Sequence, residues 1–228
     1  MMTGRRPDLA TGHAGEGPEL VLMHGWGYDA TLWDDVAPLL APLAVTKLEA
    51  GYFGAAPFLT LPTRPFIAIG HSAGGLWFLK QNLAHCRAVI LINSFTRFTR
   101  GEDFPSGQAA SILARMSRRL ATAPKDVITT FRKNIGDSSA FCHPVTDRLM
   151  SGLADLSADD ARHQARIMTP PIHALAGSDD PLIPSPLSRM CFENPHHLAW
   201  AEGGHMLPLT QPHLCARFIR NIFDDLHP

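Results

Sequence analysis

The chain has 228 residues, a formal net charge of −1, and a composition that is 45% hydrophobic and 18% charged. This apolar content supports a packed core and excludes a broadly disordered chain, and the balanced charge argues against a general nucleic-acid binder. No apolar run approaches the ~20 residues of a membrane span, and residues 1–13 lack the apolar core of a secretion signal.

Four cysteines are scattered through the chain without a C-x-x-C pair: Cys86, Cys142, Cys191 and Cys215. This spacing predicts neither a disulfide framework nor a cysteine-built zinc site, and no H-E-x-x-H or comparable histidine pair occurs. We therefore expect a cytoplasmic, monomeric protein with no metal and no cofactor.

Short apolar runs alternate with helical patterns along most of the chain. Continuous apolar runs are typical of buried strands, so the alternation predicts an α/β fold with a mostly parallel sheet and helices on both faces. The predicted strands are Glu19–Met23, Ala44–Leu48, Phe66–Gly70, Ala88–Ile92, Ile172–Ala176 and Leu198–Ala201. The helices predicted between and after them are Thr31–Ala41, Gly74–Ala84 and Pro212–Leu226.

Residues 95–168 interrupt this alternation, because they contain helical patterns and no candidate strand. We predict a helical insertion there, acting as a lid over a core formed by residues 1–94 and 169–228. Its predicted helices are Gln108–Ala121, Pro124–Asn134, His143–Leu153 and Asp159–Arg166.

Gly70-His71-Ser72-Ala73-Gly74 matches the G-x-S-x-G motif and lies between a predicted strand and a predicted helix, the context that the motif requires. Such a turn lifts the serine hydroxyl above the sheet. It also directs the N–H groups at the start of the helix, and the positive end of the helix dipole, toward a developing oxyanion. The context favours Ser72 as a nucleophile over a plain glycine-rich turn.

A serine nucleophile needs a base and a group that orients the base, in this architecture in the chain order serine, acid, histidine. Asp179 and Asp180 follow the predicted strand Ile172–Ala176, and His205 follows the last strand in the sequence E-G-G-H. Each could alone be a turn or solvated loop residue, but their order and their place at strand ends favour catalysis. The other histidines considered lie in other loops, on the last helix or facing solvent: His24, His71, His213, His196 and His197.

The loop after the first predicted strand reads His24-Gly25-Trp26-Gly27. In this architecture that loop supplies one oxyanion N–H and the residue after the nucleophile supplies the other, so we predict the backbone N–H groups of Trp26 and Ala73 as donors. The Trp26 ring either covers an acyl chain or packs within the loop.

From Glu19 to Leu226 the sequence resembles the α/β-hydrolase family. Within that family, three features look like the esterases that cleave the methyl ester of a pimeloyl chain on acyl carrier protein in biotin synthesis. They are the HGWG loop, the continuation of the motif as Gly74-Gly75-Leu76, and the pattern Leu149-x-x-Gly152-Leu153-x-x-Leu156-x-x-x-Asp160-x-Arg162.

The resemblance implies an α/β-hydrolase fold and a serine carboxylic ester hydrolase, with Ser72 as nucleophile, Asp180 as acid and His205 as base. It prefers Asp180 to Asp179 because the family pattern G-x-x-D-x-x-[VI]-P places the acid fourth. The substrate implied is an acyl ester carried on acyl carrier protein, and the implied substrate-binding residues are Trp26, Phe131, Ile135 and His205.

The chain departs from its relatives after the second predicted strand, where they carry an aspartate, a glycine-rich turn and a long helix. Here residues 49–54 are followed by a short proline-containing segment up to Pro65. We therefore predict that this helix is missing or reduced to a turn.

Six basic residues between positions 115 and 133 stand against the single acidic residue Asp126: Arg115, Arg118, Arg119, Lys125, Arg132 and Lys133. This excess suits the docking of an acidic carrier protein, although an ordinary solvated helix face has the same composition.

Two alternative functions remain: a hydrolase of free small esters or thioesters, and a non-catalytic binding module on the same fold. The filled nucleophile, acid and base positions argue against the binding module.

Overall fold

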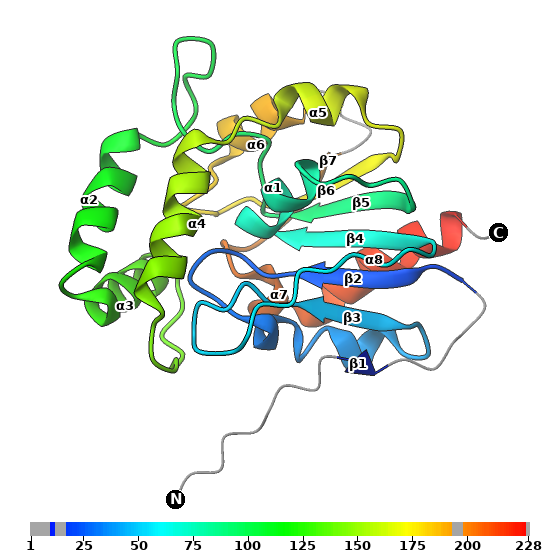
Figure 1. The fold of residues 1–228 in the computed structure, drawn as a ribbon. Helices are drawn as coiled ribbons and strands as arrows, with labels where there is room; N and C mark the ends of the chain where they lie inside the picture. Colours follow the sequence, from blue (N-terminus) through cyan, green and yellow to red (C-terminus); the bar gives the residue numbers. More distant parts are fainter. Residues whose placement is uncertain (1–9, 12–16, 193–197, 227–228) are drawn as a thin grey trace, which may run out of the picture.

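The computed structural model describes residues 10–11, 17–192 and 198–226, which form a sheet in the order β1-β3-β2-β4-β5-β6-β7 (Figure 1). The short edge strand β1 (Ala10–Thr11) pairs antiparallel with β3, and every other neighbouring pair is parallel. The remaining strands are β2 (Glu19–Met23), β3 (Val45–Leu48), β4 (Phe66–His71), β5 (Cys86–Ile92), β6 (Ile172–Gly177) and β7 (Leu198–Ala201). The predicted α/β fold and its six apolar strands are confirmed.

Alternate side chains of each strand enter two separate cores. In β2, Val21 and Met23 pack on the face covered by α1 (Ala73–Leu79) and α6 (Ser185–Cys191), whereas Leu20 and Leu22 pack on the opposite face. That opposite face is covered by the 3₁₀ helices η1 (Ala30–Trp33) and η2 (Ala37–Leu40) and by the helices α7 (Leu207–Thr210) and α8 (Pro212–Asp225). A sheet with helices on both faces buries its strands completely, which explains their continuous apolar runs.

The single helix predicted over residues 31–41 is wrong, because η1 and η2 replace it. Pro38 has no backbone N–H and cannot continue an α-helical hydrogen-bond series, so the segment divides. The segment nevertheless buries most of the apolar face that helical spacing predicts: Leu32, Val36 and Leu40 are buried, whereas Leu39 is only partly buried.

The helix predicted over residues 74–84 begins as expected but ends at Leu79. The Asn82 side chain accepts a hydrogen bond from the Ala84 N–H, an alternative to helical pairing that short polar side chains commonly offer. Between β3 and β4 no helix forms, in agreement with the prediction for residues 49–65.

Four helices lie between β5 and β6: α2 (Ala110–Leu120), α3 (Pro124–Asn134), α4 (Thr146–Ala158) and α5 (Arg162–Ile167). Of these, α2, α3 and α4 gather beyond the carboxyl ends of the central strands, at the left of Figure 1. The third predicted helix, His143–Leu153, starts three residues late and ends five residues late, and the fourth, Asp159–Arg166, starts at Arg162. Asp159 is extended, and the Asp160 carboxylate accepts the Arg162 N–H to open a new helix.

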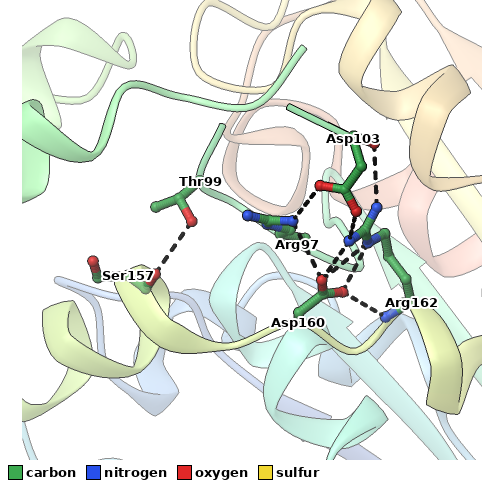
Figure 2. A network of polar contacts seen from close by, with 6 residues as sticks. All are labelled: Arg97, Thr99, Asp103, Ser157, Asp160 and Arg162. Carbon is green, nitrogen blue, oxygen red and sulfur yellow. Dashed lines mark hydrogen bonds and ion pairs between the residues drawn. The ribbon is translucent and has the colours of Figure 1, made fainter. Parts of the chain in front are cut away.

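Two arginines and two aspartates join the segment that leaves β5 to the α4–α5 junction (Figure 2). The guanidinium of Arg162 donates to Asp103 and Asp160, each at 2.6 Å, and Arg97 donates to the same two carboxylates at 3.1 and 3.4 Å. The Arg162 hydrogen bonds hold the pKa of both carboxyl groups below the usual range. The Asp160 and Arg162 of the sequence pattern therefore tie together the two ends of the helical segment.

Candidate active site

The register of the parallel strands brings the loops with the predicted site residues to one edge of the sheet. Met23 lies opposite Gly70, His71 opposite Ile92, and Gly177 opposite Ala201. The segments that follow β2, β4, β5, β6 and β7 consequently converge, as carboxyl-end loops of open α/β sheets do.

Ser72 occupies a strained turn between β4 and α1, with φ 52° and ψ −124°. A residue with a Cβ rarely adopts a positive φ, so the surrounding contacts must hold the turn in place. A Cβ on Gly74 would lie 2.5 Å from the carbonyl oxygens of Met23 and His24. Glycine at this position therefore lets the start of α1 press directly against the loop that follows β2.

Two consecutive hydrogen bonds join Ser72, His205 and Asp180 in one row. The Ser72 hydroxyl lies 3.1 Å from His205 Nε2, and His205 Nδ1 lies 2.7 Å from Asp180 Oδ2. The other carboxylate oxygen of Asp180 accepts the N–H groups of Leu182 and Ile183, both at 2.8 Å. Because the carboxylate accepts from Nδ1–H, Nε2 is left free to accept the serine proton, as a general base must.

Of the two candidate acids, only Asp180 reaches the histidine. Asp180 is 5% exposed, whereas Asp179 is an exposed residue whose carboxylate accepts a hydrogen bond from its neighbour Ser178 at 2.9 Å. Asp180 is therefore the candidate acid that contacts His205.

Three further residues, none of them predicted to take part, support this row. Asn93 Nδ2 donates to the carbonyl oxygens of Gly204 and His205 at 2.8 and 2.7 Å, and His71 Nε2 lies 2.9 Å from the same His205 carbonyl. Ser94 Oγ donates to the Ser72 carbonyl at 2.7 Å. Their position in the sequence is the signal that indicates this role, because each residue lies at the end of β4 or directly after β5, beside the serine turn.

His71 is wholly buried, and burial together with the neighbouring His205 lowers its pKa to about 3. It is therefore neutral at ordinary pH and donates from Nε2 to the His205 carbonyl. His24 is also buried, and its Nε2 accepts the Ala50 N–H at 3.1 Å while its Nδ1 donates to the Gly25 carbonyl at 2.9 Å. His213 lies on α8 with an exposed side chain, and His196 and His197 lie outside the described residues.

The loop after β2 lies directly against the serine, since a Cβ on Gly25 would be 3.1 Å from the Ser72 Cβ. Neither the Trp26 N–H nor the Ala73 N–H hydrogen bonds to another group in the described part of the chain. Trp26 is 3% exposed, and its ring donates from Nε1 to the Leu149 carbonyl at 2.9 Å and meets the Phe131 ring edge-on with the ring centroids 4.9 Å apart.

A cavity of about 480 Å³ opens above Ser72. Trp26, Phe131 and Ile135, predicted to contact substrate, all line it, whereas His205 is not among its lining residues and contacts the lining residue Ser72. The walls are mainly apolar and come from the segment after β5 and from α2, α3 and α4. Arg115 and Arg119 of α2 also line the cavity.

A model of the alpha/beta hydrolase family matches residues 44–218. The chain belongs to this family. Among solved structures, an esterase of Exiguobacterium antarcticum has a TM-score of 0.77 at 16% identity, with 92% of this chain and 93% of that chain covered. A hydrolase of Oleispira antarctica has a TM-score of 0.75 at 15% identity, with 92% of both chains covered. These likenesses concern the fold.

Curated relatives of this hydrolase include a pimeloyl-[acyl-carrier protein] methyl ester esterase of Legionella pneumophila (strain Corby). It is 28% identical over 194 residues, which covers 75% of this chain and 79% of the relative. A protein with the same name from Xanthomonas axonopodis pv. citri is 26% identical over 225 residues, covering 84% of this chain and 89% of the relative.

One of the six basic residues counted between positions 115 and 133 does not belong to the hydrolase's surface. Arg132 is 4% exposed and lies among the rings of Tyr28, Phe53 and Phe141. We call the five exposed residues the basic face: Arg115, Arg118, Arg119, Lys125 and Lys133.

Among the helices of the described residues, none is long and apolar enough to cross a bilayer.

Proposed function

We propose that this hydrolase is a serine carboxylic ester hydrolase with Ser72, His205 and Asp180 as its catalytic residues. The observation that carries the proposal is the row of hydrogen bonds from Asp180 through His205 to a strained serine beneath an apolar cavity. Nucleophile, base and orienting acid lie within the distances at which such groups act together.

In the proposed reaction, His205 Nε2 takes the hydroxyl proton as Ser72 Oγ bonds to the ester carbonyl carbon. The resulting oxyanion accepts hydrogen bonds from the N–H groups of Trp26 and Ala73, and Asp180 stabilises the imidazolium. When the tetrahedral intermediate collapses, the ester C–O bond breaks and the leaving alkoxide takes the proton from His205. Water then attacks the acyl-enzyme by the same route and releases the acid.

The substrate that we propose is the methyl ester of a pimeloyl-type acyl chain on acyl carrier protein, as in biotin synthesis. The names of the curated relatives support this substrate, and so does an apolar cavity beside a basic face. In this proposal residues 95–168 form a lid over a core of residues 1–94 and 169–228, and Trp26, Phe131 and Ile135 contact the acyl chain. The alternative is a hydrolase of free esters or thioesters.

Replacing Ser72 with alanine tests the reaction. With a chromogenic short-chain ester, we expect Ser72→Ala to lose several orders of magnitude in kcat while its circular dichroism stays that of the wild type. Ser138→Ala, an exposed serine between α3 and α4, is the matched control and should keep wild-type turnover. Substantial turnover by purified Ser72→Ala would contradict the proposal.

The substrate is tested separately by growth. The wild-type gene, but not the Ser72→Ala gene, should restore growth without biotin to a bacterial strain that lacks its pimeloyl-[acyl-carrier protein] methyl ester esterase. Failure to restore growth by a protein that hydrolyses the chromogenic ester would favour the free-ester alternative.

A further inference from the structure

Arg132, on the last turn of α3, is a buried cation bound to the loop beside Ser72. Its Nε and Nη2 donate to the Gly27 carbonyl at 3.1 and 2.9 Å, and its Nη1 donates to Ser139 Oγ at 3.2 Å. The guanidinium also lies 4.3 Å from the centroid of the Tyr28 ring. A planar group with several fixed donors suits this site, where a lysine ammonium would not reproduce the paired contact.

Two peptide groups connect this guanidinium to the proposed oxyanion donor. The Gly27 carbonyl, which accepts from Arg132, belongs to the same peptide as the Tyr28 N–H, which donates to the Gly25 carbonyl at 3.3 Å. The Gly25 carbonyl in turn belongs to the same peptide as the Trp26 N–H. A hydrogen-bonded series therefore runs from a fixed positive charge, through two peptides, to the Trp26 N–H, the proposed oxyanion donor.

The contacts around Arg132 keep it in place. Asp137 Oδ2 lies 3.9 Å from Arg132 Nη1 and accepts the Tyr28 hydroxyl proton at 2.8 Å. Burial acts to raise the pKa of Asp137, but hydrogen bonds from Ser139 and Tyr28, together with the Arg132 charge, outweigh it and hold the pKa below its usual range. The carboxylate is therefore ionised and pairs with the arginine at ordinary pH.

The neighbouring residue joins the same loop from the same helix. A Cβ on Gly27 would lie 3.3 Å from the Phe131 ring, and Phe131 itself contacts the Trp26 ring. Successive residues of α3 therefore hold the loop in two ways: Phe131 packs against its side chain, and Arg132 binds its backbone.

We propose that Arg132 is a positioning residue that orients and polarises the Trp26 N–H for oxyanion stabilisation. The inference rests on the proposed function and adds a residue to it. Hydrogen bonds in series strengthen one another by roughly 10–30% per bond, and a donor fixed before the reaction spends no free energy on reorientation as charge develops. Arg132 would thus act in the transition state without touching the substrate.

The test compares Arg132→Met and Arg132→Lys with the wild type on a chromogenic short-chain ester. We expect kcat to fall by roughly 10- to 100-fold in Arg132→Met, less than the ~10²–10³-fold that loss of an oxyanion donor costs. KM should stay within about threefold, because the donor matters most when charge has developed. The pH at half-maximal kcat should not move, because His205 and Asp180 are untouched.

Arg220 provides the matched control. It is an arginine of α8 that donates to the carbonyls of Leu39 and Ala41, on the sheet face opposite α1. Arg220→Met removes an equivalent arginine-to-backbone contact, so it should lower the thermal midpoint but leave kcat per folded molecule within twofold of the wild type. Rates are normalised to the folded fraction measured by circular dichroism.

A rescue experiment separates positioning from general destabilisation. Arg132→Ala leaves room for a free guanidinium ion, so a few tens of millimolar guanidinium should raise kcat severalfold at constant thermal midpoint, and equimolar sodium should not. Folded Arg132 variants with kcat within twofold of the wild type, or the same loss in Arg220→Met, would overturn the inference. A wild-type protein without Ser72-dependent turnover would instead overturn the proposed function.

Discussion

At the scale of single residues, the candidate site depends on buried polar side chains that use their opposite ends for different partners. Asn93 donates to two carbonyls of the loop that carries His205 and accepts the Gly177 N–H at 2.7 Å with its oxygen. An amide donates from its nitrogen and accepts with its oxygen, whereas an ionised carboxylate can only accept, which explains why asparagine rather than aspartate fits this position. The loops after β5, β6 and β7 are thereby linked through one side chain.

The two neighbouring aspartates should differ sharply when each is replaced by asparagine. We expect Asp180→Asn to lower kcat by ~10³–10⁴-fold, because the amide cannot stabilise the imidazolium or fix the His205 tautomer. Asp179→Asn should stay within about threefold of the wild type, since that carboxylate is exposed and, among the described residues, accepts a hydrogen bond from its neighbour Ser178 rather than from His205. Steady-state kinetics on a short-chain ester would decide, and equal losses in the two variants would contradict the choice of Asp180.

His71 predicts how stability depends on pH. The unfolded histidine binds a proton below about pH 6.5, whereas the folded one stays neutral until about pH 3. The unfolded state therefore binds more protons in this window, and the free energy of unfolding should fall by ~1.4 kcal/mol per pH unit from this residue as the pH is lowered.

Urea unfolding of the wild type and of His71→Gln between pH 4 and 7 measures this contribution. The variant should lose that part of the slope, whereas His213→Gln, at an exposed position on α8, should keep the wild-type slope. Identical slopes in the wild type and His71→Gln would mean that the buried histidine is protonated in the folded protein.

At the scale of elements, α3 and α4 both bind the loop that follows β2. From α3, Phe131 and Arg132 contact the loop, and from α4 the Leu149 carbonyl accepts the Trp26 indole N–H. Two helices of the proposed lid are thus attached to the predicted oxyanion loop. Movement of either helix would therefore displace that loop.

Gly152 of α4 tests this attachment. Alanine normally stabilises a helix by up to about 1 kcal/mol over glycine, but a Cβ here would lie 2.4 Å from the Tyr52 hydroxyl and 2.8 Å from Trp26 Cδ1. We expect Gly152→Ala to destabilise the protein by ~1–3 kcal/mol, as overpacking does, and to lower kcat by shifting Trp26.

Thermal melts and ester kinetics would measure both effects. Ser151→Ala, at the preceding, exposed position of α4, is the control. It should leave the thermal midpoint and kcat within error of the wild type, or raise the thermal midpoint slightly. A more stable and fully active Gly152→Ala would show that α4 can move away from the loop without consequence.

The sequence predicted those elements whose residues are governed by burial on a regular period. Strands such as Ala88–Ile92 were evident because a parallel sheet covered on both faces needs continuous apolar runs. The boundaries at Leu79 and Asp159 were missed because local side-chain hydrogen bonds and a backbone change, not periodicity, end those helices.

In the candidate site, too, some residues follow from sequence patterns and others depend on contacts made only in the folded protein. Ser72 and His205 were predicted because a motif and a strand end place them, and the resemblance to the family pattern distinguished Asp180 from Asp179. Arg132 was counted as a surface charge, because nothing in its own helix reveals that Tyr28 and Gly27 enclose it. Contacts between residues 105 positions apart are set by the assembled loops, which the local pattern does not encode.

At the scale of the whole molecule, positive charge is concentrated where the proposed carrier protein would dock. The chain as a whole has a net charge of −1, yet the five residues of the basic face lie on α2 and α3 against one exposed acidic residue, Asp126. Only two of the five, Arg115 and Arg119, line the cavity. The other three can therefore be changed without altering the space that a small ester occupies.

Replacing Arg118, Lys125 and Lys133 with glutamine together should slow hydrolysis of a carrier-bound ester but not of a small one. Exposed charges steer an acidic partner over distances that salt screens beyond about 8–10 Å. At low ionic strength the kcat/KM of the variant for the carrier-bound ester should be roughly 10-fold below that of the wild type. The difference between the two should shrink as salt is added. Kinetics on both substrates across a salt series would measure it.

The control removes the same number of charges elsewhere: Arg87, Arg166 and Arg217, which are exposed and lie outside α2 and α3, are replaced with glutamine. If net charge alone attracted the carrier protein, both triple variants would slow equally. If the basic face is structural, its variant would slow both substrates. Loss confined to the carrier-bound ester, in the basic-face variant alone, is what docking at α2 and α3 requires, because the reacting groups below the cavity are the same in every variant.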